Sequence, residues 1–170
     1  MTDQSPATPA SPAPDRAAIR AELESVRKEY LALLDSLSAE DWKAKSANHA
    51  WTVGQLMWHL GRGVEFFSQN VDWCRKGKAP NPPTWIVNPG NVLITRIGSR
   101  GATKESAREK YESAHQKLLA CLETVREDEW GKSVTAYGTK NSIESSFGGP
   151  AEHLAEHKTD ILKGLGRQPA

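Results

Sequence analysis

The sequence predicts an all-α protein, an antiparallel four-helix bundle that forms one domain. Large apolar residues recur at alternating spacings of three and four in four long segments, which is typical of helices with one buried face. The alternation of apolar and polar residues found in β-strands is absent, apart from a short piece at residues 133–137. A chain of 170 residues is also long enough to bury a single core without disulfide bonds.

The first helix is expected to follow a segment whose composition does not favour an ordered structure. Residues 1–14 are rich in Pro, Ala and Ser and carry almost no large apolar side chain, so we expect a disordered tail there. The bundle is expected to occupy residues 15–166 and to begin at Asp15, which suits the N-cap of a helix. A further helical turn is predicted at residues 38–42, where a serine precedes acidic residues.

The second helix is expected to begin at a capping box formed by Thr52 and Gln55, and its apolar stripe continues to Cys74. The third helix is expected over residues 103–126. The connection between them is longer than a compact domain usually leaves unstructured. We therefore predict an extra short helix within it, at residues 89–97.

The last predicted helix carries two histidines. It is expected to begin at Pro150, because proline is favoured at the first helical position, and to stop at Gly166. His153 and His157 are four residues apart, so both side chains project from one face of the helix and can bind one ion. They share this face with Ile161, which places them toward the interior, where an unpaired imidazole is unfavourable.

A third histidine, His59, lies within the apolar run of the second helix and is expected to meet the pair from a neighbouring helix. Three imidazoles suit Zn, Ni, Fe or Cu better than Mg or Ca, and they leave a coordination position open. The alternative is that all three are core histidines without a metal. His49 and His115 are assigned structural or surface roles, and Gly61 and Gly63 either permit close helix packing or leave room for a ligand.

Charge and composition disfavour several classes of protein. Lys and Arg total 22 against 21 Asp and Glu, so the net charge of +1 gives no basic face for nucleic acid. The sequence has no apolar run long enough to span a membrane and no secretory signal, and we expect a cytoplasmic protein without a membrane partner. Cys74 and Cys121 are expected to be buried thiols.

Three parts of the sequence resemble one known family. They are the segment WTVGQLMWHL that begins at Trp51, the region of Trp85 and Asn91, and the segment EHLAEHKTDI near the end of the chain. Together they resemble the DinB/YfiT-like superfamily, which includes bacillithiol and mycothiol S-transferases. The resemblance covers about residues 16–165.

The resemblance implies a four-helix bundle in which one histidine of the second helix and an HxxxH pair of the last helix hold Zn, Ni or Fe. These positions are His59, His153 and His157 in this sequence. It also implies an activity, because members with known activity commonly use the metal with a low-molecular-weight thiol, which they join to an electrophile or use to isomerise a substrate.

The expected function is therefore a thiol-dependent S-transferase that acts on a small electrophile in detoxification or a stress response. A metal-dependent hydrolase is an alternative, since the same ion can activate water. A non-catalytic, metal-stabilised bundle that binds a small molecule or a protein partner is another. A homodimer is a further expectation, because apolar stripes on long helices often mark association surfaces.

Other residues near the three histidines are candidates for supporting roles. Asp160 and Glu156 are candidates to accept hydrogen bonds from the imidazoles, although Glu156 is better explained as a solvated surface acid. Trp58, Trp85 and Asn91 are candidates to line the mouth of a pocket, because tryptophan combines a large apolar face with one donor.

Overall fold

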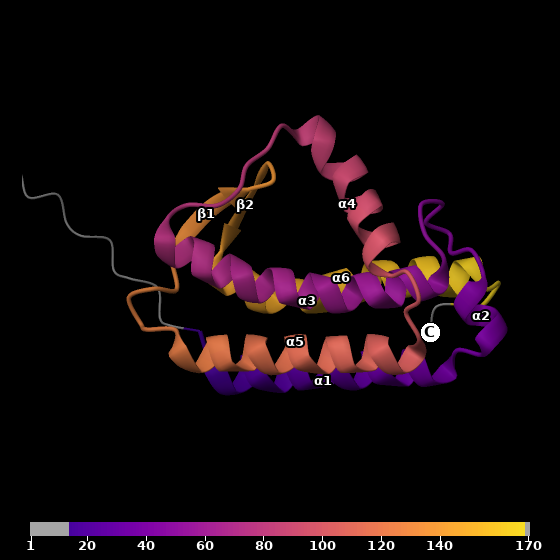
Figure 1. Ribbon diagram of the computed structural model, residues 1–170. Coiled ribbons are helices and arrows are strands. Elements are labelled where there is room, and N and C mark those ends of the chain that lie inside the picture. The colour runs from indigo at the N-terminus through magenta and orange to yellow at the C-terminus, as the bar shows by residue number, and fades with distance from the viewer. Residues whose placement is uncertain (1–13, 169–170) are drawn as a thin grey trace, which may run out of the picture.

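The computed structural model describes residues 14–168, so the predicted tail lies almost entirely outside the described residues. The protein is mostly helical, and four long helices lie side by side (Figure 1): α1 (Arg16–Ser36), α3 (Val53–Lys76), α5 (Lys104–Thr124) and α6 (Ile143–Gly164). The connections contain the short helix α2 (Ala39–Lys43), the helix α4 (Thr84–Gly98) and a hairpin of β1 (Ser133–Ala136) and β2 (Thr139–Ser142).

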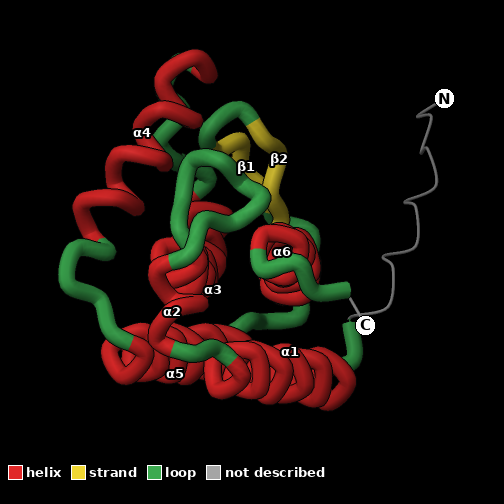
Figure 2. The backbone as a smooth tube through the Cα atoms, turned by 90° about the vertical axis from the view of Figure 1, so that its right-hand side faces the viewer, coloured by secondary structure: helices red, strands yellow, loops and turns green. Residues whose placement is uncertain are grey.

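The four long helices form two layers, with α3 and α6 packed on α1 and α5 (Figure 2). Helices α1 and α5 run antiparallel, because an ion pair joins Arg20 near the start of α1 to Glu123 near the end of α5. At the other end of the pair, Arg108 binds Asp35. The antiparallel order that the sequence predicts therefore holds for this pair of neighbours.

Helices α3 and α5 run parallel, which differs from the antiparallel order expected. Lys110 and Glu65 form an ion pair of 2.6 Å near the middle of both helices, and Arg75 donates to Thr124 Oγ1 at 3.1 Å near their ends. The reason is the long connection through α4, which carries the chain back to the end at which α3 began (Figure 1). Helix α6 then runs antiparallel to α3.

Several helix starts agree with the local signals in the sequence. The Asp15 carboxylate accepts hydrogen bonds from the first N–H groups of α1, and Thr52 forms a capping box with Gln55 at the start of α3. Ser38 caps α2 and Thr103 caps α5 in the same manner. These caps satisfy N–H groups that have no partner within the helix.

Two helices begin earlier than predicted. Helix α6 begins at Ile143 rather than Pro150, because Ser142 forms a capping box with Ser145. Helix α4 begins at Thr84 rather than at residue 89, and Pro89 lies inside it. A proline inside a helix removes one backbone hydrogen bond, and here the neighbouring turns continue past it.

The short strand predicted near residues 133–137 is present as β1 and pairs antiparallel with β2. The turn between them is Tyr137–Gly138, and both residues have positive φ, of 53° and 81°, as a tight two-residue hairpin requires. Strand β2 has too few apolar residues for its pattern to be recognised in the sequence. The hairpin also holds the proline-rich segment, since Tyr137 N–H donates to the Pro80 carbonyl at 3.1 Å and Gly138 N–H to Asn81 at 2.8 Å.

The core lies between the two helix layers. Tyr30 and Tyr111 stack there with ring centroids 3.7 Å apart, and the Tyr30 hydroxyl lies 3.2 Å from the Met57 carbonyl. The other large, fully enclosed side chains are mainly aliphatic: Leu23, Leu34, Leu56, Leu60, Leu118, Leu122, Ile143, Leu154 and Ile161. Within residues 14–168, no helix is both long and apolar enough to cross a membrane.

The remaining cysteines and histidines fit the packing. Cys74 is buried and Cys121 is half-buried, and both are free thiols. His115 is buried and lies 3.1 Å from a Glu24 carboxylate oxygen, which gives it a structural role, whereas His49 is exposed.

Two helical glycines provide a test of this packing. A Cβ at Gly164 would lie 2.6–2.8 Å from backbone atoms of residues 45–47, whereas a Cβ at Gly90 would meet nothing within 4 Å. Gly164→Ala should lower the free energy of unfolding by about 1–3 kcal/mol, because backbone atoms must move. Gly90→Ala should raise it by about 0.5–1 kcal/mol through helix propensity. Urea denaturation of both variants measures this, and equal effects would contradict the packing of α6 on this loop.

Candidate metal centre

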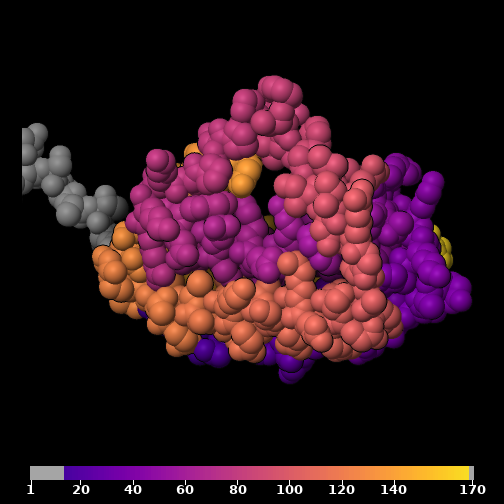
Figure 3. All heavy atoms as spheres, viewed as in Figure 1, coloured from indigo at the N-terminus to yellow at the C-terminus, as the bar shows by residue number. Residues whose placement is uncertain are grey.

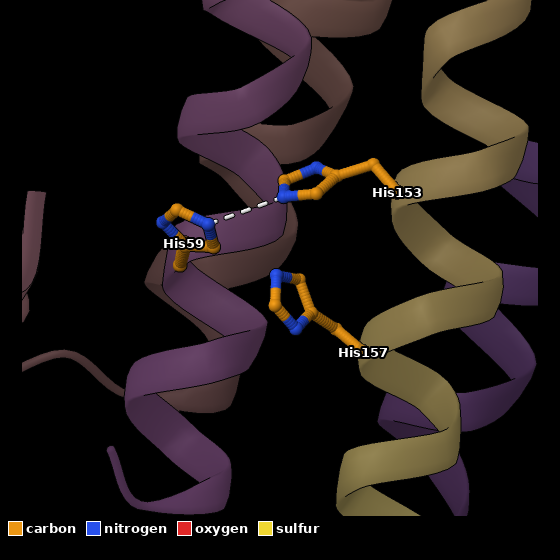
Figure 4. Close-up of side chains that lie close together, drawn as sticks. All are labelled: His59, His153 and His157. Carbon is orange, nitrogen blue, oxygen red and sulfur yellow. Dashed lines mark hydrogen bonds between the residues drawn. The ribbon is translucent and has the colours of Figure 1, made fainter. Parts of the chain in front are cut away.

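Three histidine side chains from α3 and α6 meet between the two helices (Figure 4). Each offers one ring nitrogen, and these three atoms all lie within 4.8 Å of one another. Nε2 of His59 and Nε2 of His153 are 3.1 Å apart. His157 lies one turn after His153 on α6, so the structure brings together the three histidines that the sequence singles out.

Glycine makes this meeting possible. A Cβ at Gly63 would lie 2.4 Å from Nδ1 of His153, so only a residue without a side chain leaves space for that ring. A Cβ at Gly61 would instead lie 3.3–3.5 Å from atoms of Lys110 and Tyr111 on α5. Gly61 therefore permits close helix packing, and Gly63 makes room for a histidine.

Two of the imidazoles have a hydrogen-bond partner on the side away from the cluster. Nδ1 of His157 lies 3.1 Å from Asp160 Oδ2, and Nδ1 of His59 lies 3.2 Å from Thr95 Oγ1. An ionised carboxylate only accepts, so Nδ1 of His157 carries the proton and its Nε2 presents a lone pair to the other rings. Asp160 has the contact that its spacing suggested, whereas Glu156 is exposed.

Thr95 and Trp51 are contacts that the sequence analysis did not identify. Thr95 is fully buried on α4, and its one recognisable signal is a small polar residue that follows the apolar residues 92–94. Trp51 stacks on His59 with ring centroids 4.6 Å apart and meets His157 edge-on at 6.1 Å. These two residues fix the orientation of the His59 ring.

The environment favours the neutral form of two of the imidazoles, those of His59 and His153. Burial, with smaller contributions from the nearby His153, His157 and Arg62, lowers the pKa of His59 to about 3. Burial, with a smaller effect from His157, lowers the pKa of His153 to about 4. Neutral imidazole is the form that binds a metal ion.

The cluster fits a transition-metal ion. In the tautomer of His59 whose Nδ1 donates to Thr95, lone pairs of His59 and His157 face the same space as the His153 ring. Facing lone pairs repel unless a proton or a cation lies between them. A tetrahedral ion with Zn–N bonds of about 2.0–2.1 Å holds its nitrogen ligands about 3.4 Å apart, close to the 3.1 Å between His59 and His153.

A cavity of about 490 Å³ lies next to the cluster, between α3, α4 and the hairpin. Figure 3 shows the hollow beneath α4 from one side. His59 and His153 form part of its wall, and Asn91 lines it as expected of a pocket residue. Trp85 is 77% exposed, and Trp58 packs against Gly98 and beneath Lys110, so neither tryptophan is among the residues that line the cavity.

Comparison with protein families matches residues 4–161 to the DinB superfamily. The chain belongs to the DinB superfamily. Among solved structures, this DinB-superfamily chain is similar to the crystal structure of the mycothiol-dependent maleylpyruvate isomerase, with a TM-score of 0.70 and 13% sequence identity. The match covers 87% of this chain and 61% of the isomerase, and at this identity it shows the shared fold. No curated protein matches the sequence.

The depressed histidine pKa values predict how stability depends on pH in the metal-free protein. The unfolded chain protonates these side chains below about pH 6.5, whereas the folded DinB-superfamily chain keeps His153 neutral to about pH 4 and His59 to about pH 3. The free energy of unfolding should therefore fall as the pH is lowered from 6.5 toward 4, by up to about 1.4 kcal/mol per pH unit for each histidine.

Urea denaturation of chelator-treated protein at several pH values measures this slope. A variant with His59→Gln and His153→Gln should show a shallower dependence over the same range. An identical slope in the two proteins would show that these imidazoles are not held neutral.

Proposed function

We propose that this protein is a metal-dependent enzyme that holds Zn, Ni or Fe on His59, His153 and His157 and joins a low-molecular-weight thiol to a small electrophile. One observation carries the proposal: the histidine cluster opens onto a cavity of about 490 Å³. Trp51 and Asp160 contact the histidines on other sides. A further ligand of the ion would therefore come from the cavity, as in catalytic rather than structural metal sites.

The lining of the cavity favours a thiol over water as the nucleophile. A bound divalent ion lowers the pKa of a thiol or a water molecule and so supplies a nucleophile at neutral pH. The described residues that line the cavity include no carboxylate to act as a general base. A thiol, with an ordinary pKa of about 8.5, needs less help to ionise than water does.

The side chains of the chain itself would position and protect the reactants. Thr95 and Asp160 hold two imidazoles in fixed orientations, which supports their role as ligands. Phe67 contacts the edge of His153 with ring centroids 6.2 Å apart and gives the cavity an apolar wall beside the cluster. Such a wall excludes water and favours transfer of the thiol over hydrolysis.

The similar solved structure supports the use of a thiol, since that isomerase is mycothiol-dependent. The chain spans 61% of the length of that protein, so the likeness does not extend to the rest of the isomerase.

Removal of one ligand should remove the metal. We expect about one equivalent of Zn, Ni or Fe per chain in the wild type and less than about a tenth of that in His157→Ala, since two imidazoles bind more weakly than three. His49→Ala is the matched control, because His49 is an exposed histidine outside the cluster. Elemental analysis of protein purified without chelator measures this, and equal metal content in both variants would contradict the site.

The activity is testable with mycothiol or bacillithiol as the thiol and chlorodinitrobenzene as the electrophile. Formation of the thioether releases chloride, and the thiol proton passes to solvent. The rate should fall at least about a hundredfold in His157→Ala, because a metal ion contributes several kcal/mol to such a step.

Product analysis separates the candidate functions in the same assay. The thioether as the product supports the transferase. Dinitrophenol formed at the same rate without thiol would instead indicate a hydrolase, and no product from loaded protein would count against both enzymatic functions for these reagents.

A further inference from the structure

We propose that the cavity selects substrates with an apolar body and one carboxylate group, and that Arg62 binds this carboxylate. The inference rests on the proposed function, because it names the substrate class of the same site. It follows from the charge, the hydrogen bonds and the apolar walls of the cavity.

Arg62 is a cation without a counter-charge among the described residues. It lies one turn after His59 on α3, is half-buried and lines the cavity. It forms no ion pair with any carboxylate of residues 14–168. Glu65, the acid one turn further along α3, is already bound by Lys110 at 2.6 Å. A partly desolvated guanidinium without an anionic partner favours an anion from outside the chain.

The cavity offers that anion no competitor and no repulsion. Fourteen described residues line it, and none of them is acidic. The other polar side chains of the lining are those of His59, His153, Asn88, Asn91 and Tyr137. Arg62 is therefore the one Lys, Arg, Asp or Glu residue of the lining, so the ligand that matches it carries one negative group.

The orientation of Arg62 suits a carboxylate. Its Nη1 donates to Asn91 Oδ1 at 2.8 Å, which holds the guanidinium in place across the space between α3 and α4. A guanidinium has five N–H groups, so the others remain to bind two carboxylate oxygens side by side. Because Oδ1 of Asn91 accepts this bond, its amide N–H groups are further donors at the same point.

The rest of the cavity is apolar and partly aromatic. Phe66 meets Phe67 with ring centroids 5.9 Å apart and Tyr137 at 6.0 Å, and Ile86 and Ile94 line the side formed by α4. A volume of about 490 Å³ is in the range of sites for small molecules. A carboxylate on Arg62 would thus leave a ring-sized apolar body between these walls.

The position of Arg62 relative to the histidines connects the carboxylate to the reaction. Residues three apart on a helix lie on the same face, about 5–6 Å apart at Cβ. A ligand held at Arg62 therefore has its apolar body beside His59 and His153. The carbon that reacts would then lie near the histidine cluster. Long substrates, in which the carboxylate is far from the reacting atom, would be excluded.

The test is isothermal titration calorimetry of the full chain with phenylacetate and phenylacetamide, which share a ring and differ in charge. Both are titrated into chelator-treated and zinc-loaded protein. In metal-free wild type, phenylacetate should bind about ten to a hundred times more tightly than the amide, as expected for a charged hydrogen bond. The metal-free titrations do not depend on a metal site, so a failure of the proposed function is seen separately.

Variants assign the preference to Arg62. Arg62→Gln should bind both compounds equally. Arg62→Lys should keep part of the preference for phenylacetate, and that remaining preference shows that the fold is retained. Arg100→Gln, at an exposed arginine outside the cavity, should behave as the wild type. Phe66→Ala should weaken both compounds by a similar factor.

Two results would overturn the proposal. One is equal affinity for the acid and the amide in metal-free wild type. The other is a preference for the acid that survives Arg62→Gln, since the carboxylate would then bind elsewhere. This includes a preference that is seen only in zinc-loaded protein, because the carboxylate would then bind the metal ion itself.

Discussion

The candidate centre depends on the close antiparallel contact between α3 and α6. Gly63 and Gly149 bring the helices together, because a Cβ at either position would overlap a ring of the opposite helix, His153 or Phe67. Asn70 of α3 donates to Ser146 of α6 at 2.9 Å in the same interface. With larger residues at the glycine positions, the histidines of the two helices would be held further apart.

This contact places three imidazole rings in the interior, where their desolvation is unfavourable. Neighbouring side chains offset part of that desolvation. Three imidazoles share a small space, and desolvation favours the neutral form of His59 and His153. Thr95, Asp160 and Trp51 satisfy or cover the faces that point away from the cluster. Ring nitrogens of the three histidines face one another, and Nε2 of His59 lies 3.1 Å from Nε2 of His153, so an ion between them would bind to more than one ring.

The chain connection creates the cavity. Because α3 and α5 run parallel, the segment between them must return along the molecule, and α4 makes this return above α3 (Figure 1). Helix α4 contributes Thr95 to the histidine cluster and Asn91 to Arg62, so one connecting helix supports both parts of the site. The hairpin fixes the other end of the connection through Tyr137 and Gly138. The topology thus provides a pocket that four helices joined by short loops would lack.

Features that depend on neighbours along the chain can be predicted from the amino-acid sequence. Apolar spacing gave the four long helices, the Thr52 capping box gave the start of α3, and the spacing of His153 and His157 gave a pair on one helical face. How these pieces pack depends on contacts between segments distant in sequence. The sequence predicts that His59 meets the pair, whereas the roles of Thr95 and Trp51 and the lack of a counter-charge for Arg62 among residues 14–168 come from the fold. The start of α6 and strand β2 were not predicted from the sequence. Pro150 is a stronger local signal for a helix start than the serine caps, and a short polar strand has no apolar pattern. Local propensities act within a few residues, whereas helix direction and cavity shape are set by packing across the whole fold.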